Sequence, residues 1–275
     1  MHVGVAMFAT DYSMPPTDLA IALEERGFES YWFPEHSHIP LSRGSEFPKG
    51  GELPKKYFDV MDPFVVMGAA AAVTTKLKVA TGICLVPQRD TIQTAKSVAS
   101  IDQISNGRFL FGIGSGWNAD EMENHGTAFK TRNKKMREQI IAMKHIWTET
   151  KPEYHGDFVD FDPMMTWPKP AQVPHPPVIV GGGIPYAAKR ALDYGDGWLP
   201  HAHRPTYKLL DRLPEFREME KAAGRSIPIS AFGVEHDADA WAAYEDAGIE
   251  RIIISMESEL ADAVLPKLDA WAKRL

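Results

Sequence analysis

The stretch Val3-Gly4-Val5-Ala6-Met7-Phe8-Ala9-Thr10-Asp11-Tyr12-Ser13 decides between two folds for this chain. Its first six residues form an apolar run that is typical of a buried β-strand. In an open dinucleotide-binding sheet, the first strand leads into a glycine-rich turn that approaches the phosphates. Residues 9–13 contain no glycine. The stretch therefore favours a (β/α)8 barrel, also called a TIM barrel, over a doubly wound open sheet.

The same alternation of a short apolar run and a longer amphipathic segment continues along the chain. Strand-like runs cover residues 3–8, 30–33, 77–86, 109–112, 178–181, 197–199, 227–232 and 251–255. Helix-like segments follow them at residues 16–26, 63–74, 92–105, 133–149, 186–194, 206–223, 238–246 and 259–274. The chain therefore has eight strand–helix units in 275 residues, or about 34 residues per unit. This number and size of units are typical of a (β/α)8 barrel. We predict an α/β fold with a single (β/α)8 barrel domain over residues 1–275.

Composition excludes several classes of protein. With 44% hydrophobic and 24% charged residues, the chain is expected to be globular. The net charge is 30 − 37 = −7, which argues against a nucleic-acid partner. Cys84 is the one cysteine, so neither an intrachain disulfide nor a cysteine-built zinc site is possible. The first basic residue is Arg26, and prolines fill the uncharged stretch between Lys169 and Lys189, so we predict a cytoplasmic protein with no membrane partner.

Two connections are longer than a barrel needs, at residues 35–61 and 151–177. We expect both at the C-terminal face of the strands, where barrel enzymes place their active sites. A flap over an anionic ligand would suit the first connection, although a solvated surface loop is the alternative. Its basic and aromatic residues are Arg43, Lys49, Lys55, Lys56 and Tyr57.

Glu35-His36-Ser37-His38 directly follows the second predicted strand. Histidine changes its charge near neutral pH, so His36 at a strand end is a candidate for proton transfer. A structural, hydrogen-bonded histidine is the alternative. On an extended segment His36 and His38 would face the same side and could share a metal ion, with His201 or His203 as a third ligand. Because no acidic cluster accompanies them, we predict no metal site.

Two glycine-rich turns are candidates for ligand contact. Gly112, Gly114 and Gly116 would let a flat ligand approach the backbone, although this spacing is not the dinucleotide fingerprint. Gly181 to Gly183 end the fifth strand before a helix, and backbone N–H groups at a helix N-terminus bind phosphate. A tight turn without a ligand is the alternative. Cys84, within an apolar strand, is expected to be a buried small hydrophobe.

Taken together, these stretches resemble the luciferase-like family of flavin and deazaflavin oxidoreductases. The chain's length and its Glu-His-Ser-His-Ile-Pro stretch are most similar to the subgroup that uses coenzyme F420, a 5-deazaflavin. The resemblance covers nearly the whole chain in order. It is carried by residues 32–36, 77–83, 95–96, 102–108, 112–117, Glu121, Gly126, Arg132, 180–182 and 196–198.

The resemblance implies a barrel with the cofactor ring across the strand ends. It also implies a non-prolyl cis peptide in the third strand, which by position is Gly82-Ile83. The implied cofactor contacts are Gly82, Ile83, Gly116, Trp117, Asp120, Gly181, Gly182 and Gly183. Where the sugar-phosphate dehydrogenase branch has a catalytic carboxylate, this chain has Trp117, so that substrate is not expected. Thr91 replaces a common proline at a helix start.

The expected reaction is hydride transfer between C5 of F420 and a small organic substrate. His36 is the expected proton donor or acceptor, with His38 or Glu35 tuning it. One alternative is an FMN-dependent monooxygenase that uses reduced flavin and oxygen on the same barrel. Another is a deazaflavin carrier without strong catalysis, for which a closed barrel face would be expected. The resemblance also implies a homodimer.

Overall fold

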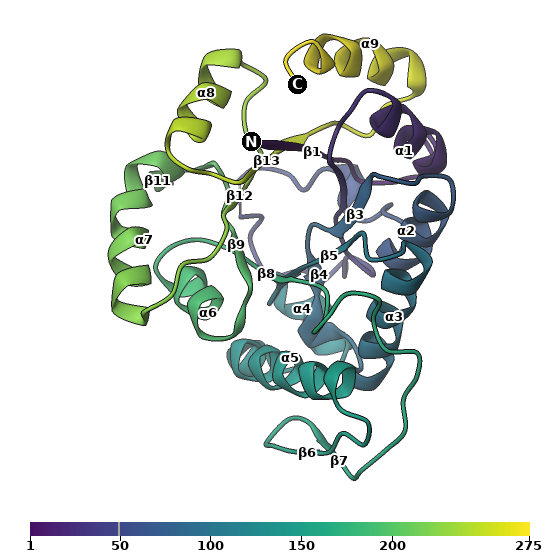
Figure 1. The fold of residues 1–275 in the computed structure, drawn as a ribbon, viewed down its shortest axis with the longest axis vertical. Coiled ribbons are helices and arrows are strands. Elements are labelled where there is room, and N and C mark those ends of the chain that lie inside the picture. The colour runs from purple at the N-terminus through teal and green to yellow at the C-terminus, as the bar shows by residue number, and fades with distance from the viewer. Residues whose placement is uncertain (49) are drawn as a thin grey trace.

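The computed structural model describes residues 1–48 and 50–275, and it contains a barrel of parallel strands (Figure 1). Around the barrel the order is β12-β13-β1-β2-β3-β5-β8-β9, and parallel bridges from Trp198 to Ile229 and from His201 to Phe232 join the two ends. The predicted (β/α)8 fold is therefore confirmed. The strands are β1 (His2–Ala6), β2 (Ser30–Phe33), β3 (Lys78–Thr81), β5 (Phe109–Gly114), β8 (Val178–Gly181), β9 (Gly197–Leu199), β12 (Ser230–Phe232) and β13 (Arg251–Ser255).

Helices surround the strands as an outer ring in Figure 1. They are α1 (Pro16–Glu25), α2 (Pro63–Ala72), α3 (Thr91–Ile104), α5 (Arg132–Thr148), α6 (Tyr186–Tyr194), α7 (Leu209–Ala223), α8 (Ala238–Asp246) and α9 (Ala261–Ala272). The short helix α4 (Ala119–Asn124) and the 3-10 turns η1 (Lys55–Tyr57), η2 (Val86–Gln88) and η3 (Phe129–Thr131) were not predicted. Across the described part of the chain, no helix is long and apolar enough to span a membrane.

A cluster of apolar side chains fills the middle of the barrel. Large and small residues alternate in it, since the indole of Trp32 on β2 lies between Ala6 on β1 and Ala80 on β3. At Gly4 a Cβ would lie 2.4 Å from the Ser30 hydroxyl, so glycine is required beside this indole. The cluster is made of Ala6, Trp32, Ala80, Leu110, Ile179, Leu199 and Ile253, with Phe232 and Ile83 packed against it.

The third strand is interrupted. The sequence predicts one continuous strand over residues 77–86, but the structure has β3, then a cis peptide between Gly82 and Ile83, then β4 (Cys84–Leu85), which pairs with β5. The cis peptide that the resemblance implies at this position is thus confirmed. Cys84 is fully buried in β4, and burial raises the pKa of its thiol well above the ordinary value, as expected for a small core residue.

The two long connections lie at opposite ends of the barrel. Residues 35–61 follow β2 at the C-terminal face, as predicted; Lys49 of that segment lies outside the described residues. The prediction for residues 151–177 was wrong, because this segment leads from the end of α5 to the start of β8. Gln172 Nε2 donates to the carbonyl oxygen of Phe109, the first residue of β5, over 2.9 Å. The segment carries a hairpin of β6 (Tyr154–His155) and β7 (Asp160–Phe161), outside α5 in Figure 1.

Candidate active site

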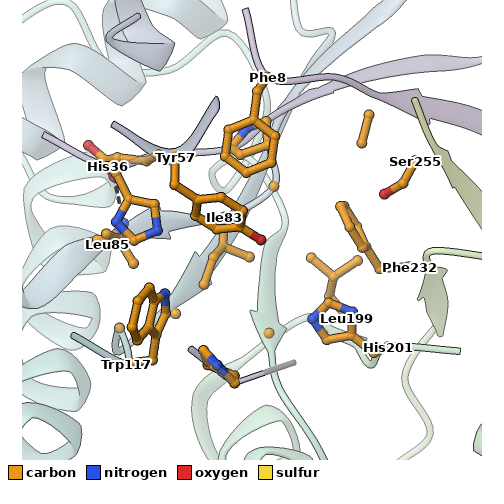
Figure 2. Close-up of a pocket in the computed structure, with 18 of the residues that line it drawn as sticks. Phe8, His36, Tyr57, Ile83, Leu85, Trp117, Leu199, His201, Phe232 and Ser255 are labelled. Carbon is orange, nitrogen blue, oxygen red and sulfur yellow. Dashed lines mark hydrogen bonds between the residues drawn. The ribbon is translucent and has the colours of Figure 1, made fainter. Parts of the chain in front are cut away.

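A cavity of about 430 Å³ opens at the C-terminal face of the barrel. Figure 2 shows His36, Tyr57 and Trp117 on one side and Leu199, His201 and Phe232 on the other, with Ile83 between them. Its volume lies in the range of small-molecule sites, and its position is where barrel enzymes carry out their chemistry. Among the described residues, the predicted site residues that line it are Glu35, His36, Gly82, Ile83, Gly116, Trp117, Gly181 and Gly182.

Ile83 forms the floor of this cavity, and glycines on the adjoining strands make room for it. A Cβ at Gly114 would lie 1.9 Å from Ile83 Cδ1, and one at Gly181 would lie 3.0 Å from Ile83 Cγ2. At Gly112 a Cβ would lie 2.0 Å from the carbonyl oxygen of Thr81. The glycines at 112 and 114 therefore accommodate the interrupted third strand, which is a packing role that sequence reasoning did not foresee.

His36 is held by Glu121. Its Nδ1 lies 2.8 Å from Glu121 Oε2, and the Ser37 backbone N–H donates to Glu121 Oε1 over 3.1 Å. Glu121 is fully buried at the start of α4, and His36 is 8% exposed. A carboxylate on Nδ1 fixes the ring so that Nε2 is the nitrogen available to a ligand. This pair is suited to proton transfer at the cavity wall.

Aromatic rings enclose His36. The ring centroids of Tyr57 and Trp117 lie 5.4 and 5.8 Å from that of His36. Phe47 packs against both, at 5.1 Å from Tyr57 and 6.0 Å from Trp117. Tyr57 and Phe47 belong to the 35–61 connection, so this segment builds one wall of the cavity. Its apolar rings cover part of the strand ends; a flap over an anionic ligand stays a prediction.

Glu35 does not contact His36 through a hydrogen bond. One of its oxygens accepts from the Leu85 backbone N–H over 2.6 Å, and the other accepts from Arg89 Nε over 2.6 Å. Arg89 also pairs with Asp62 over 2.8 Å. Glu35 therefore ties β4 and η2 to the end of β2, and its carboxylate holds the floor of the cavity in place.

His38 lies outside the set of described residues that line the cavity. The segment is not extended, because the chain bends at Ser37, so the condition under which His36 and His38 would face the same side is not met. His38 Nδ1 lies 2.9 Å from the Ser37 hydroxyl, and its Nε2 lies 2.9 Å from Asn124 Nδ2. Within residues 1–48 and 50–275, no three His, Cys, Asp or Glu side chains gather as metal ligands.

Arg190 at one corner of the cavity and Arg132 behind it have no acidic partner among the described residues. Arg190 on α6 lines the cavity beside Gly181 and Gly182, and Arg132 begins α5 nearby. In both residues Nε is buried and has no hydrogen-bond partner among the described residues. Burial lowers the pKa of both guanidinium groups, and the charge of Arg190 lowers that of Arg132 further. We call Gly181, Gly182, Arg132 and Arg190 the arginine corner; it has the chemistry of an anion site.

Two predicted cofactor contacts lie beside the cavity and not among its described lining residues. Asp120 accepts from the Gly44 backbone N–H over 2.8 Å, which fastens the 35–61 connection to α4. Gly183 accepts from the Ala187 N–H, and a Cβ on it would lie 3.0 Å from the Tyr207 hydroxyl. The sequence predicts that the backbone N–H groups of this turn bind a phosphate. The Gly182 N–H instead donates to the carbonyl oxygen of Leu199, so it is not free to do so.

The opposite wall comes from β12, β13 and a hairpin of β10 (His203–Arg204) and β11 (Tyr207–Lys208). His201 packs edge-on against Phe232, with centroids 5.4 Å apart. Lys56 from the 35–61 connection pairs with Glu257 over 2.5 Å and closes the rim between the two walls. Arg204 also lines the cavity. The cavity thus has a histidine on one wall and a guanidinium on the other.

With the site described, comparison with known proteins identifies its family. A sequence profile of the luciferase-like monooxygenases matches residues 16–269, and the chain belongs to this family. The uncharacterized protein Rv0953c of Mycobacterium tuberculosis is 35% identical over 100% of this chain and 99% of its own. An FMNH(2)-dependent dimethylsulfone monooxygenase of Pseudomonas putida is 31% identical over 62% of this chain and 48% of its own. A solved F420-dependent secondary alcohol dehydrogenase has a TM-score of 0.76 at 20% identity, covering 100% of this chain and 98% of its own.

Three residues of the site were not singled out from sequence. Glu121 appeared only as part of the family resemblance, since an acid in the first turn of a short helix is ordinary. Arg190 follows Gly183 by about two helical turns, so its approach to the glycine turn depends on the packing of α6. Arg204 lies in a short hairpin that has no strong strand pattern. Local sequence carries no signal for contacts of this kind.

Proposed function

We propose that this protein is an F420-dependent oxidoreductase that transfers a hydride between the deazaflavin C5 and a small organic substrate. The single observation that carries the proposal is the arrangement of the cavity, with Ile83 at its floor, the His36–Glu121 pair on one wall and the arginine corner beside it. The resemblance in sequence and the F420-dependent relative of the same fold support this cofactor.

The residues present fit such a cofactor. Arg132 and Arg190 lack a negatively charged partner, and the cofactor's phosphate would supply one. Its oxygens would also accept hydrogen bonds from the two buried Nε atoms. Leaving two neighbouring guanidinium groups without an anion is costly, so this corner is explained best by a ligand. Ile83, Gly116 and Trp117 would contact the ring.

The cofactor supplies the hydride chemistry when bound, and the protein supplies binding, orientation and a proton. Glu121 accepts from His36 Nδ1 and keeps Nε2 directed at the cavity. His36 Nε2 gives a proton to the substrate oxygen in reduction, or takes it in oxidation. Phe47, Tyr57 and Trp117 exclude water from the reacting atoms.

The relative that uses FMNH(2) favours a second candidate, an FMN-dependent monooxygenase. Because FMN and F420 share ring shape and phosphate, the arginine corner would suit either. A closed barrel face would favour the third candidate, a carrier without strong catalysis. A cavity of about 430 Å³ that the 35–61 connection helps to line argues against it.

A fluorescence titration of the purified protein with F420 and, separately, with FMN tests the proposal. We expect tight binding of F420 and much weaker binding of FMN. Preference for FMN would replace the proposal with oxygen chemistry. Binding of neither would mean that the arginine corner is not a cofactor site.

A further inference from the structure

Among the described residues, the charges that line the cavity do not balance. Three cations, Lys56, Arg190 and Arg204, face two carboxylates, Glu35 and Glu257, in the part of the lining that the structure describes. Glu35 is bound to Arg89, outside the cavity, and Glu257 is bound to Lys56. If the cofactor phosphate occupies the arginine corner, Arg204 is the cation that still lacks an anion.

Arg204 is held in a defined place. It pairs with Tyr207 across the β10–β11 hairpin, and it lines the same cavity as Tyr57 on the opposite wall. Among the described side chains, no hydrogen bond or ion pair reaches its guanidinium. Burial lowers its pKa, and only the two tyrosines oppose this effect. The buried hydroxyl of Tyr207 also lacks a partner among the described residues.

A guanidinium in such a setting is suited to a carboxylate. Its planar fork donates two parallel hydrogen bonds to the two oxygens, and partial burial strengthens the attraction. Removal of the cation from water is costly without an anion. In a chain with a net charge of −7, an unpaired arginine inside the cavity also attracts anions that the surface as a whole would repel.

Tyr57, Arg204 and His36 all line the same cavity. The ring centroid of Tyr57 lies 5.4 Å from the His36 ring, and its hydroxyl end points into the cavity in Figure 2, away from His36. His36 and Arg204 both line this cavity of about 430 Å³, on opposite walls. A molecule of a few carbon atoms can therefore reach both.

We infer that the substrate is a small organic carboxylate whose carboxylate binds Arg204 while its carbonyl or hydroxyl group faces His36. The inference rests on the proposed function and names the substrate class of the same site. In the reductive direction, one hydride adds to the carbonyl carbon and one proton from His36 Nε2 adds to its oxygen. The product is the hydroxy acid, and the cofactor is oxidised by two electrons.

Matched probes test this inference on the F420-loaded protein. Oxo-carboxylates of three to six carbons and their uncharged amides are compared by isothermal titration calorimetry, in the wild type and in Arg204→Gln. We expect at least one acid to bind about tenfold more tightly than its amide in the wild type, and this preference to vanish in Arg204→Gln. Arg137→Gln, an exposed arginine that pairs with Asp193, is the matched control and should keep the preference.

Two outcomes would overturn the inference. In one, the wild type shows no preference for any acid over its amide. In the other, Arg204→Gln weakens F420 itself severalfold, which would assign Arg204 to the carboxylates of the cofactor tail. If the wild type fails to bind F420 at all, the proposed function fails separately, and the same acid and amide pairs applied to the cofactor-free protein still test Arg204.

Discussion

The two ends of the barrel treat buried charge in opposite ways. At the N-terminal end Arg251 pairs with Glu29 over 2.6 and 2.8 Å and donates to the Ser230 hydroxyl over 3.0 Å. At the C-terminal end Arg190 and Arg204 face the cavity without a carboxylate among the described residues. Since unpaired buried charge destabilises a fold, the difference separates a face built for stability from one built for ligands.

Other groups at the N-terminal end are equally well satisfied. Arg108 donates to the carbonyl oxygens of Ser105, Ala71 and Thr74 over 2.7, 2.9 and 3.0 Å. Asp102, fully buried, accepts twice from Gln172, over 2.7 and 2.8 Å. These contacts join α2, α3 and the 151–177 segment to the strand starts. Substitutions at the two ends should therefore affect different measurable quantities.

The largest expected effect is on turnover at the C-terminal end. We predict that His36→Ala lowers the turnover number about 10²- to 10⁴-fold, because the proton donor is lost. Its F420 affinity should change little, whereas its free energy of unfolding should fall, because the fully buried Glu121 loses its partner. Steady-state kinetics with the acid substrate, together with the F420 titration, measure this split. His155→Ala on the exposed β6–β7 hairpin is the matched control.

Glu121→Gln sharpens the same test. The amide can still hydrogen bond to His36 Nδ1, but it no longer stabilises an imidazolium. We expect a loss of turnover smaller than that of His36→Ala, together with a changed dependence of turnover on pH. If His36→Ala retained full turnover, the proton-transfer role would be removed from the mechanism.

A large effect on stability is expected at the other end. Arg251→Met removes both hydrogen bonds from Arg251 to the half-buried Glu29, which keeps only Lys78 as a charged partner 2.9 Å away, and we predict a loss of about 2 kcal/mol in the free energy of unfolding. Although burial raises the pKa of Glu29, the hydrogen bond and charge of Arg251 hold it at about 2. Urea denaturation measures the loss, and F420 affinity should be unaffected. A variant as stable as the wild type would contradict the comparison.

Periodicity predicted the architecture well, because each strand–helix unit repeats the same local pattern. It could not predict at which end of the barrel residues 151–177 lie, because a long loop has no periodic pattern of apolar residues. The cis peptide at Gly82-Ile83 came from the family resemblance, and the same resemblance contained Glu121 without marking its role. Glu35 and His38 stand beside His36 in sequence, yet a bend at Ser37 gives them other partners. Adjacency in sequence is a weak guide where the backbone is irregular.

Substitution in the arginine corner should have a smaller effect, and it should change F420 affinity without lowering the free energy of unfolding. We predict that Arg190→Gln weakens F420 binding about tenfold, since a charge-assisted hydrogen bond to phosphate is lost. The free energy of unfolding of the cofactor-free protein should stay the same or rise, because an unpaired buried cation is removed. The F420 titration and urea denaturation check both halves. A stability loss like that of Arg251→Met would break the distinction between the two ends.

The smallest expected effect concerns acid stability at the N-terminal end. The carboxylate of Glu24 accepts from the backbone N–H groups of Thr75, Lys76 and Leu77, the residues that lead into β3. Burial raises its pKa, but these hydrogen bonds outweigh that effect and hold the pKa at about 2, below the ordinary 4.5. The stabilisation is therefore complete above pH 4.5 and is lost as the pH falls from 4.5 toward 2.

Glu24→Gln should remove this part of the pH dependence. Because the site is largely open to solvent, we expect a loss of about 1 kcal/mol in the free energy of unfolding at pH 7. Urea denaturation at pH 7, 4 and 3 follows the difference between variant and wild type, which should shrink as the pH falls. Glu25→Gln, one residue along on the exposed face of α1, is the matched control. A difference that stays constant with pH would show that Glu24 acts through packing alone, and the N-terminal end would then not owe this stability to paired charge.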